Sequence, residues 1–404
     1  MAPWLAAAGA FVVSLDSMMN IAFPSMASAF AIPAETIRWV IICYTAVYAI
    51  TAFAGGAVAD LVGYMRVFRA GVALTALALL AGGCAPTFEW LLAARVVQGF
   101  SAGLIYGTAP GIVTLAAAPE RRGRALGAFN GAIALGFALG PLPAGMLVDV
   151  FGWRAVMFAR VPFALAVLAG TFALHIGRAY GGTRRLVRLA DMRRAPVPVA
   201  CVLAFLAYAG IFAIWLLIPF YLVERRGFGA GMAGAIFTLA PLGTTLAAPL
   251  AGRAADRIGV ATPLIGGLLL EAAGLGALAF ADARTPTVLV AAALFVAGLG
   301  VGIFQVPMMT LVMGAFPSEL QGAAGGLTFL SRTLGLVTGV AALAALFAAR
   351  RTVVGFDAAF GDAFLLATGM VALGAAIALV RVRFLRPRAA ARSVRGATAR
   401  RVSE

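Results

Sequence analysis

Residues 55–63 read GGAVADLVG, and residues 251–259 read AGRAADRIG. Gly, Ala, Asp and Gly stand at matching places in the two stretches, and each matching pair is separated by 196 residues. A further pair, Pro119 and Pro317, follows at an offset of 198. A repeat at a nearly constant offset indicates that the chain contains two copies of one structural unit.

The composition around these stretches is typical of an all-α polytopic membrane protein. Hydrophobic residues make up 63% of the 404 residues, charged residues only 11%, and the mean hydropathy is +1.01. A soluble protein of this size needs a more polar surface. Twelve apolar segments are long enough to cross a hydrocarbon core of ~30 Å as helices, and too long for barrel strands. They lie at 4–28, 37–59, 67–86, 90–116, 124–149, 154–175, 197–222, 230–252, 261–280, 286–314, 323–348 and 359–383.

The arginines predict the orientation of these twelve helices. All 31 basic residues are Arg, and with the N-terminus inside, 21 fall in cytoplasmic segments and seven in outer loops. This excess predicts that both termini are cytoplasmic. Six spans per copy keep the two copies in the same orientation, as two six-helix bundles in a parallel repeat. We expect bundles at 1–176 and 197–384, a cytoplasmic linker at 177–196, and a basic tail at 385–404 that can contact anionic lipid.

Several function classes are disfavoured. The net charge of +16 sits in short arginine clusters between apolar runs, which indicates membrane topology and not a nucleic acid partner. The cysteines Cys43, Cys84 and Cys201 lie in apolar runs, where Cys acts as a small hydrophobe, and His175 ends an apolar run. The sequence shows no metal-ligand cluster, nucleotide loop or soluble domain, so no metal or cofactor is expected, and a membrane enzyme or receptor is a remote alternative. The first apolar run has no charged region before it, so we expect no cleavable signal peptide.

Two stretches resemble signatures of the major facilitator superfamily, and more closely those of its drug:proton antiporters. LDSMMNIAFP (15–24) is similar to the first-span pattern LDxTIVNVALP, matching at Asp16 and Asn20. GAVADLVGYMR (56–66) resembles GxLADRxGRR, although only Arg66 remains of the basic residues. In the family, the acid of this loop joins a charge network that holds the outward-facing form, and the reduced charge here implies a weaker network.

Three further stretches extend the resemblance to most of the chain. LLAARVVQGFSAG (91–103) is similar to the fourth-span pattern LxxxRxxQGxGAA, whose arginine is implicated in proton transfer in the family. The fifth span carries glycines at the antiporter spacing, ending in GPLPAG (140–145), and small residues there let a neighbouring helix approach closely. FGWRAVMFARVP (151–162) resembles FGWRWIFLINVP, with Arg160 in place of Asn. We could not name a partner for this arginine from the sequence.

The resemblance implies a secondary transporter of twelve spans, working as a monomer in the bacterial inner membrane, that couples a proton to efflux of small, largely apolar or cationic compounds. A facilitator or proton-coupled importer of a specific metabolite is the alternative. The residues expected to serve gating and motif roles are Gly56, Asp60, Gly63, Arg66, Gly136, Gly140, Pro141, Gly145, Gly252, Asp256, Arg257 and Gly259.

Asp16 is the leading candidate for proton coupling. It lies about twelve residues into the first span, roughly 18 Å deep, where a charge is costly and is a functional candidate by default. An acid there can load a proton from one side and release it to the other. A structural alternative is that Asp16 and Asn20, four residues apart on one helix face, bond to neighbouring helices. We expect Arg95, which keeps its proton, to tune Asp16, with a helix-packing ion pair as its alternative.

The remaining candidates follow from the resembling fold, in which spans 1, 4, 7 and 10 face a central cavity. Aromatic faces there suit apolar or cationic ligands, although core packing is the alternative for each residue. The substrate-cavity candidates are Asn20, Gln98, Tyr106, Tyr208, Trp215, Gln305 and Met308. Three charges in the membrane have less certain roles: Arg160, Glu271 on a peripheral span, and Arg332, assigned to helix packing or a cytoplasmic gate.

Overall fold

The computed structural model describes residues 2–116, 122–172, 196–316 and 321–381. Every regular element in these ranges is helical. The first half contains α1 (Ala2–Ser14), η1 (Leu15–Ser17), α2 (Met18–Ala29), η2 (Ala34–Ile37), α3 (Arg38–Val62), α4 (Tyr64–Gly83), α5 (Phe88–Ala116), α6 (Arg122–Leu139), α7 (Pro141–Phe151), α8 (Arg154–Phe158) and α9 (Val161–Phe172). The second half contains α11 (Val197–Phe220), η4 (Tyr221–Arg225), α12 (Ala230–Phe237), α13 (Leu239–Ile258), α14 (Ala261–Ala279), α15 (Thr287–Ala315), α16 (Gln321–Val354) and α17 (Phe356–Val380).

The twelve predicted membrane spans are confirmed. Among the described residues, 12 helical stretches are long and apolar enough to cross a membrane. Several spans are built from two elements, because serine, glycine or proline interrupts the helix. The first span passes from α1 through η1 to α2, and the fifth breaks at Gly140, with Pro141 at the start of α7.

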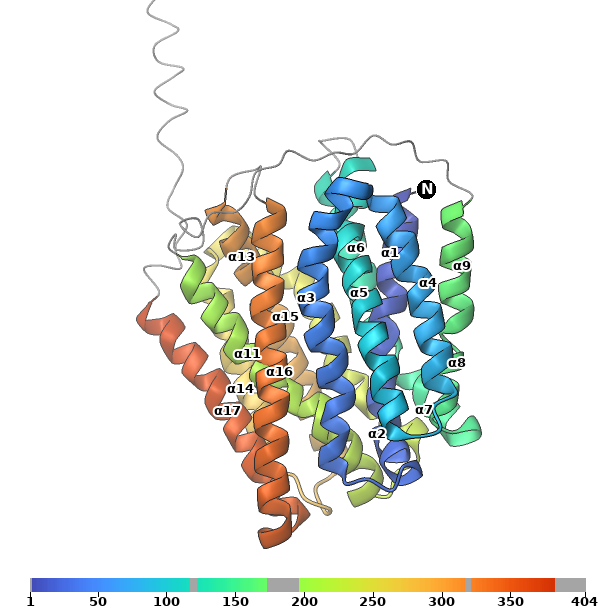
Figure 1. Cartoon of the computed structure of the whole chain (residues 1–404). Coiled ribbons are helices and arrows are strands. Elements are labelled where there is room, and N and C mark those ends of the chain that lie inside the picture. The colour runs from blue at the N-terminus through green and yellow to red at the C-terminus, as the bar shows by residue number, and fades with distance from the viewer. Residues whose placement is uncertain (1, 117–121, 173–195, 317–320, 382–404) are drawn as a thin grey trace, which may run out of the picture.

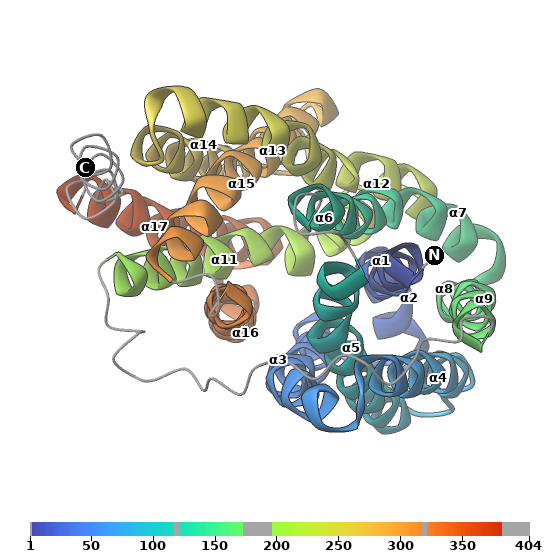
Figure 2. The ribbon, with the colours of Figure 1, turned by 90° about the horizontal axis from the view of Figure 1, so that it is seen from above.

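The helices form two groups, as the repeat predicts. Seen from above, α11, α13, α14, α15 and α17 gather on one side, and α3, α4, α5, α8 and α9 on the other (Figure 2). The repeated stretches occupy equivalent places, because α3 ends at Gly63 (φ +99°) and α13 ends at Gly259 (φ +86°). Glycine suits both helix ends, since other residues rarely adopt a positive φ. The predicted linker, apart from Pro196, and the basic tail lie outside the described residues.

The two ends of the molecule differ. The start of α1 lies at the upper side in Figure 1, toward which α17 rises from the lower edge; we call this upper side the terminal face and the opposite side the distal face. At the distal face, α7 of the first half packs against α12 of the second. The Cβ of an alanine at Gly145 would clash with the Ala230 carbonyl group, so glycine permits this close contact. The two halves are therefore held together at the distal face.

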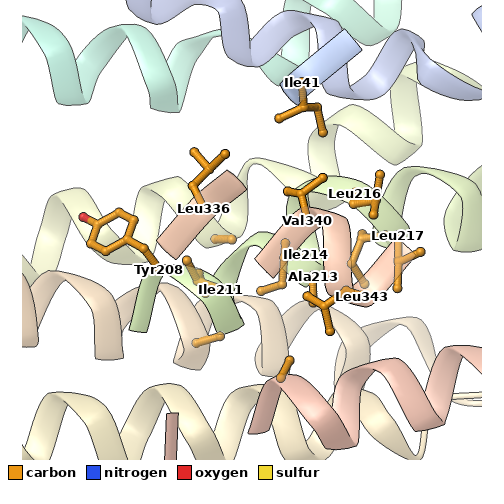
Figure 3. Packing of buried hydrophobic residues seen from close by; sticks show 14 of the residues in the cluster. Ile41, Tyr208, Ile211, Ala213, Ile214, Leu216, Leu217, Leu336, Val340 and Leu343 are labelled. Carbon is orange, nitrogen blue, oxygen red and sulfur yellow. The ribbon is translucent and has the colours of Figure 1, made fainter. Parts of the chain in front are cut away.

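Tight packing of α16 against α11 forms much of the core of the second half. Ile211, Ile214 and Leu217 of α11 interdigitate with Val340 and Leu343 of α16, and all five are buried (Figure 3). Tyr208 lies at the edge of this packing (Figure 3).

Candidate functional site

A buried charge cluster surrounds Asp16. Both oxygens of its carboxylate accept hydrogen bonds from Arg95 of α5, from Nη1 at 2.6 Å and from Nη2 at 2.7 Å. Gln98 Nε2 and Arg160 Nη1 donate to Oδ1, each at 3.0 Å. The Arg95 and Arg160 side chains are 2% and 1% exposed, and that of Asp16 is 12% exposed. This bidentate pairing is the geometry in which guanidinium and carboxylate interact most strongly.

The local structure of the first span places Asp16 at this position. The segment Leu15–Ser17 forms a 3₁₀ turn between two α-helices. The Ser14 hydroxyl donates to the Ala10 carbonyl at 2.8 Å, and the Ser17 hydroxyl to the Gly136 carbonyl at 3.4 Å. Serine bonding back to the preceding turn is a known cause of helix bending. The bend thus coincides with the residue that carries the charge.

Two glycines of the fifth span pack against Ser14 and Ser17 of this segment. A Cβ on Gly136 would lie 2.7 Å from the Cβ of Ser14, and a Cβ on Gly140 would overlap the Ser17 hydroxyl. The two glycines are therefore needed for α6 to reach the first span beside Asp16. The predicted close helix approach is confirmed, and it occurs directly behind the buried acid.

Arg95 is fixed by more than its ion pair. Its Nε donates to the Val40 carbonyl of α3 at 3.0 Å, and Nη1 donates to Gln98 Oε1 at 2.8 Å. Its guanidinium carbon lies 4.2 Å from the centre of the Tyr44 ring. Gln98 is thus part of the charge cluster, although we had placed it among the substrate-cavity residues. The predicted pairing of Arg95 with Asp16 is present in the structure.

Arg160 finds the partner that the sequence left unnamed. It lies between α8 and α9 and reaches Asp16 from the sixth span. Its Nε and Nη2 are buried and have no hydrogen-bond partner among the described residues. Two guanidiniums therefore share one carboxylate, and the second is incompletely satisfied.

The aromatic candidates meet at the interface between the halves. Tyr106 of α5 hydrogen-bonds with Ser14 at 2.9 Å and packs with Tyr48 of α3 and Phe329 of α16, with ring centres 5.8 and 5.9 Å away. Tyr48 contacts Phe329 in turn, with centres 5.2 Å apart. All three rings remain partly exposed. Sequence reasoning missed Tyr48 and Phe329, which lie on spans 2 and 11 and outside the spans we searched.

A second polar group lies on the other half. The Tyr208 hydroxyl donates to Gln305 Oε1 at 2.7 Å, and the Arg332 guanidinium stacks 4.3 Å from the centre of the Tyr208 ring. Arg332 also lies within electrostatic range of Tyr48 and Tyr106. Arg332 therefore lies at the interface between the halves, and its predicted role in helix packing or a cytoplasmic gate stays a prediction. Trp215 is partly exposed and packs against Phe137 of the first half, with ring centres 5.9 Å apart.

Three candidates are fully or nearly fully buried. Met308 is 0% exposed in the hydrophobic core, so the structure does not bring it to the partly exposed interface. Asn20 is 8% exposed and donates to the Ser17 carbonyl at 3.0 Å. Glu271 is 0% exposed, and neither of its oxygens has a hydrogen-bond partner in the described part of the chain.

The structure describes part of each repeated loop motif, at residues 56–66 and 251–259. Gly56 faces the Gly107 carbonyl, where a Cβ would lie 3.4 Å away, and a Cβ on Gly252 would lie 3.8 Å from Val306. Arg66 and Arg257 are exposed. The side chains of Asp60 and Asp256 lie outside the described residues, so their predicted charge networks stay a prediction.

Asp149 is a contact residue that sequence reasoning missed. It lies near the end of α7 and accepts hydrogen bonds from the Ala230 N–H at 2.7 Å and the Gly231 N–H at 2.6 Å. These groups begin α12 of the other half, where free N–H groups favour an anion. The sequence signal was a lone acid at the end of an apolar span. A second link at this face joins Arg351 to Glu35 at 3.7 Å and to Glu224 at 3.8 Å.

Comparison with known proteins places these features in a family. The model of the Major Facilitator Superfamily matches residues 5–197 and 200–403. The chain is 27% identical over 401 residues to the multidrug resistance protein Stp of Mycobacterium tuberculosis, covering 84% of this chain and 74% of that protein. It is 25% identical over 393 residues to the riboflavin transporter RibZ of Clostridioides difficile, covering 84% and 86%. The crystal structure of a D-xylose-proton symporter superposes with a TM-score of 0.78 at 15% identity, over 93% of this chain and 96% of that one.

The family match covers both halves of the chain, and the solved structure shares its overall fold. The chain therefore belongs to the major facilitator superfamily, and it is a membrane transport protein and not an enzyme.

Proposed function

We propose that this protein exports small, largely apolar molecules by exchange for protons, as a monomer in the bacterial inner membrane with both termini in the cytoplasm. The observation that carries the proposal is the buried Asp16 carboxylate, paired with Arg95 through two hydrogen bonds of 2.6 and 2.7 Å. An acid at this depth is costly and is a functional candidate by default. The similarity of this chain to Stp, a multidrug resistance protein, supports export as the direction of transport.

Asp16 can couple a proton to a movement because its charge determines its contacts. As a carboxylate it accepts four hydrogen bonds, three of them from the guanidiniums of Arg95 and Arg160. A protonated carboxyl loses the charge that holds these donors and gains a donor of its own. Proton uptake at Asp16 therefore weakens its attachment to α5 and to the α8–α9 junction, and proton release restores it.

The bend at Asp16 can carry that change to the fifth span. Gly136 and Gly140 pack directly on Ser14 and Ser17, on either side of the acid. Further along the same span, Gly145 and Asp149 contact α12 of the other half. The fifth span therefore connects the charge cluster with the contact that closes the distal face. Alternating access would require this contact to break and re-form in each cycle.

The test is transport in proteoliposomes with an imposed pH gradient, comparing the native protein with Asp16→Asn. We expect the variant to insert and to bind substrate, but to lose proton-driven accumulation. Glu89→Gln is the matched control, because Glu89 is an exposed acid at the start of α5. Full proton-driven transport by the Asp16→Asn protein would overturn the role of Asp16.

The similarity to the riboflavin transporter RibZ favours a second candidate, uptake of one specific metabolite. The same vesicles distinguish the two candidates. Export by exchange moves protons against the direction of the substrate, whereas proton-coupled import moves both in the same direction. A pH-sensitive dye trapped inside the vesicles reports which way protons move when substrate is added.

A further inference from the structure

Arg332 is a cation at the interface between the halves with no acidic partner among the described residues. It lies on α16 and is partly exposed, and its guanidinium stacks 4.3 Å from the centre of the Tyr208 ring. Within the residues that the structure describes, it makes no hydrogen bond and no ion pair. A charge in the membrane interior is expensive, and such residues are normally paired or serve a substrate pathway.

Arg95 provides an internal comparison. Its guanidinium also stacks on a tyrosine, 4.2 Å from the centre of the Tyr44 ring. Its donors, however, are filled by both oxygens of Asp16 and by the Gln98 and Val40 oxygens. Both arginines thus stack on a tyrosine ring, but among the described residues only Arg95 is paired with a carboxylate. Among the described residues, no acid takes the place beside Arg332 that Asp16 takes beside Arg95.

The balance of charges within the membrane spans also favours an anionic ligand. The arginine counts in the loops leave three arginines inside spans, Arg95, Arg160 and Arg332, and the described acids near them are Asp16 and Glu271. Asp16 is already shared by two guanidiniums. Glu271 is 0% exposed and bonds to none of these arginines. The interior therefore has a surplus of cationic donors, which attracts an anion and repels a cation.

The groups around Arg332 suit a planar aromatic acid. Gln305 accepts the Tyr208 hydroxyl at Oε1, and its Nε2 has no partner among the described side chains, so it can donate to a second oxygen. Tyr48, Tyr106 and Phe329 contribute partly exposed rings from both halves, which can pack on an aromatic body. We propose that Arg332 and Gln305, with Tyr208 as support, bind the carboxylate of an aromatic substrate at the interface between the halves.

This inference rests on the proposed transport function and replaces the sequence-based expectation of a cationic substrate with an anionic one. Guanidinium is the side chain best suited to a carboxylate, because its fork of donors matches the two oxygens. Contact with residues from both halves would make the bound acid sensitive to their relative position.

The experiment measures binding by isothermal titration calorimetry of the full-length protein in detergent, with no gradient present. Three probes share one ring system: 2-naphthoate, its neutral amide 2-naphthamide, and the cation 2-naphthylmethylammonium. We expect the native protein to bind the acid more tightly than the amide and the amine. Arg332→Gln should weaken binding of the acid roughly 10- to 100-fold, the range for a lost hydrogen bond to a charged group, and leave the amide within about twofold.

Two further variants make the result specific. Arg332→Lys keeps the charge but loses the planar fork, so it should retain part of the preference for the acid. Arg284→Gln is the matched control, because Arg284 is exposed in the loop between α14 and α15. Unchanged binding of the amide by Arg332→Gln shows that the variant is folded.

The proposal is overturned if the native protein prefers the amine, fails to distinguish the acid from the amide, or binds no acid. It is equally overturned if Arg332→Gln and Arg284→Gln bind the acid alike. Because binding is measured without a pH gradient, these outcomes are independent of the Asp16→Asn transport test. Loss of proton coupling at Asp16 with equal affinity for acid and amide would support the exporter and reject the acidic substrate.

Discussion

Replacing Arg160 by Asn should barely change stability, whereas replacing Arg95 by Gln should destabilise the protein strongly. Both arginines are almost completely buried and both donate to Asp16. They differ in how well they are satisfied. Arg95 makes a bidentate pair and two further hydrogen bonds, while Arg160 makes one bond of 3.0 Å and leaves Nε and Nη2 without partners in the described structure.

The magnitudes follow from these contacts. Removing Arg160 loses one hydrogen bond to a charged group, worth about 1.5–3 kcal/mol, but also relieves two buried unsatisfied donors at about 1–3 kcal/mol each. It further removes the second cation from a site with a single carboxylate. On these figures Arg160→Asn should destabilise the protein by at most about 1 kcal/mol. Removing Arg95 breaks the bidentate pair and leaves the buried Asp16 carboxylate with too few hydrogen-bond donors. This should lower the free energy of unfolding by about 3–5 kcal/mol.

The assay is unfolding of the purified variants in one detergent, followed by tryptophan fluorescence and by retention of the monodisperse peak in size-exclusion chromatography. Arg154→Asn is not a neutral control, because Arg154 donates to the Ala85 carbonyl at 2.8 Å, so the exposed Arg284→Asn serves instead. Equal destabilisation by Arg160→Asn and Arg95→Gln would refute the reasoning, since it would mean that Arg160 is as fully engaged as Arg95.

Three further predictions concern other parts of the fold. Gly140→Val should strongly reduce transport and stability, because the valine side chain would overlap the Ser17 hydroxyl. The yield of folded protein and transport in vesicles test this prediction, and normal values for both would contradict it. Asp149→Ala should loosen the distal face by removing two hydrogen bonds to the start of α12, a loss of about 0.5–2 kcal/mol by analogy with helix caps. Spin labels on α7 and α12 should then report a longer mean distance, and an unchanged distance would argue against a closing role. Glu271→Gln should change the free energy of unfolding by less than about 1 kcal/mol, because neither carboxyl oxygen has a hydrogen-bond partner among the described residues. A loss of several kcal/mol in the unfolding assay would instead show that Glu271 is ionised and paired.

Hydrophobic length and repeated glycines carried most of the information about the fold. Twelve apolar runs predicted twelve spans, because a helix in lipid must satisfy its own backbone and must be long enough to cross. The repeat at residues 55–63 and 251–259 predicted two halves, and both copies end a helix at a glycine with positive φ. The spacing of the fifth-span glycines predicted close helix approach, which the structure shows at Gly136, Gly140 and Gly145.

The partners of the buried charges were beyond the sequence alone. Asp16, Arg95 and Arg160 are separated by up to 144 residues, and only the packing of the first, fourth and sixth spans brings them within 3.0 Å. Helical periodicity relates residues three or four apart, and it contains no information about contacts between distant spans. The sequence by itself therefore determined the number of spans, the repeat and which residues are charged within the membrane. Tertiary structure decided that Arg95 and Arg160 pair with Asp16 and that Arg332 pairs with no acid in the described residues, because pairing depends on how helices distant in the chain pack against each other.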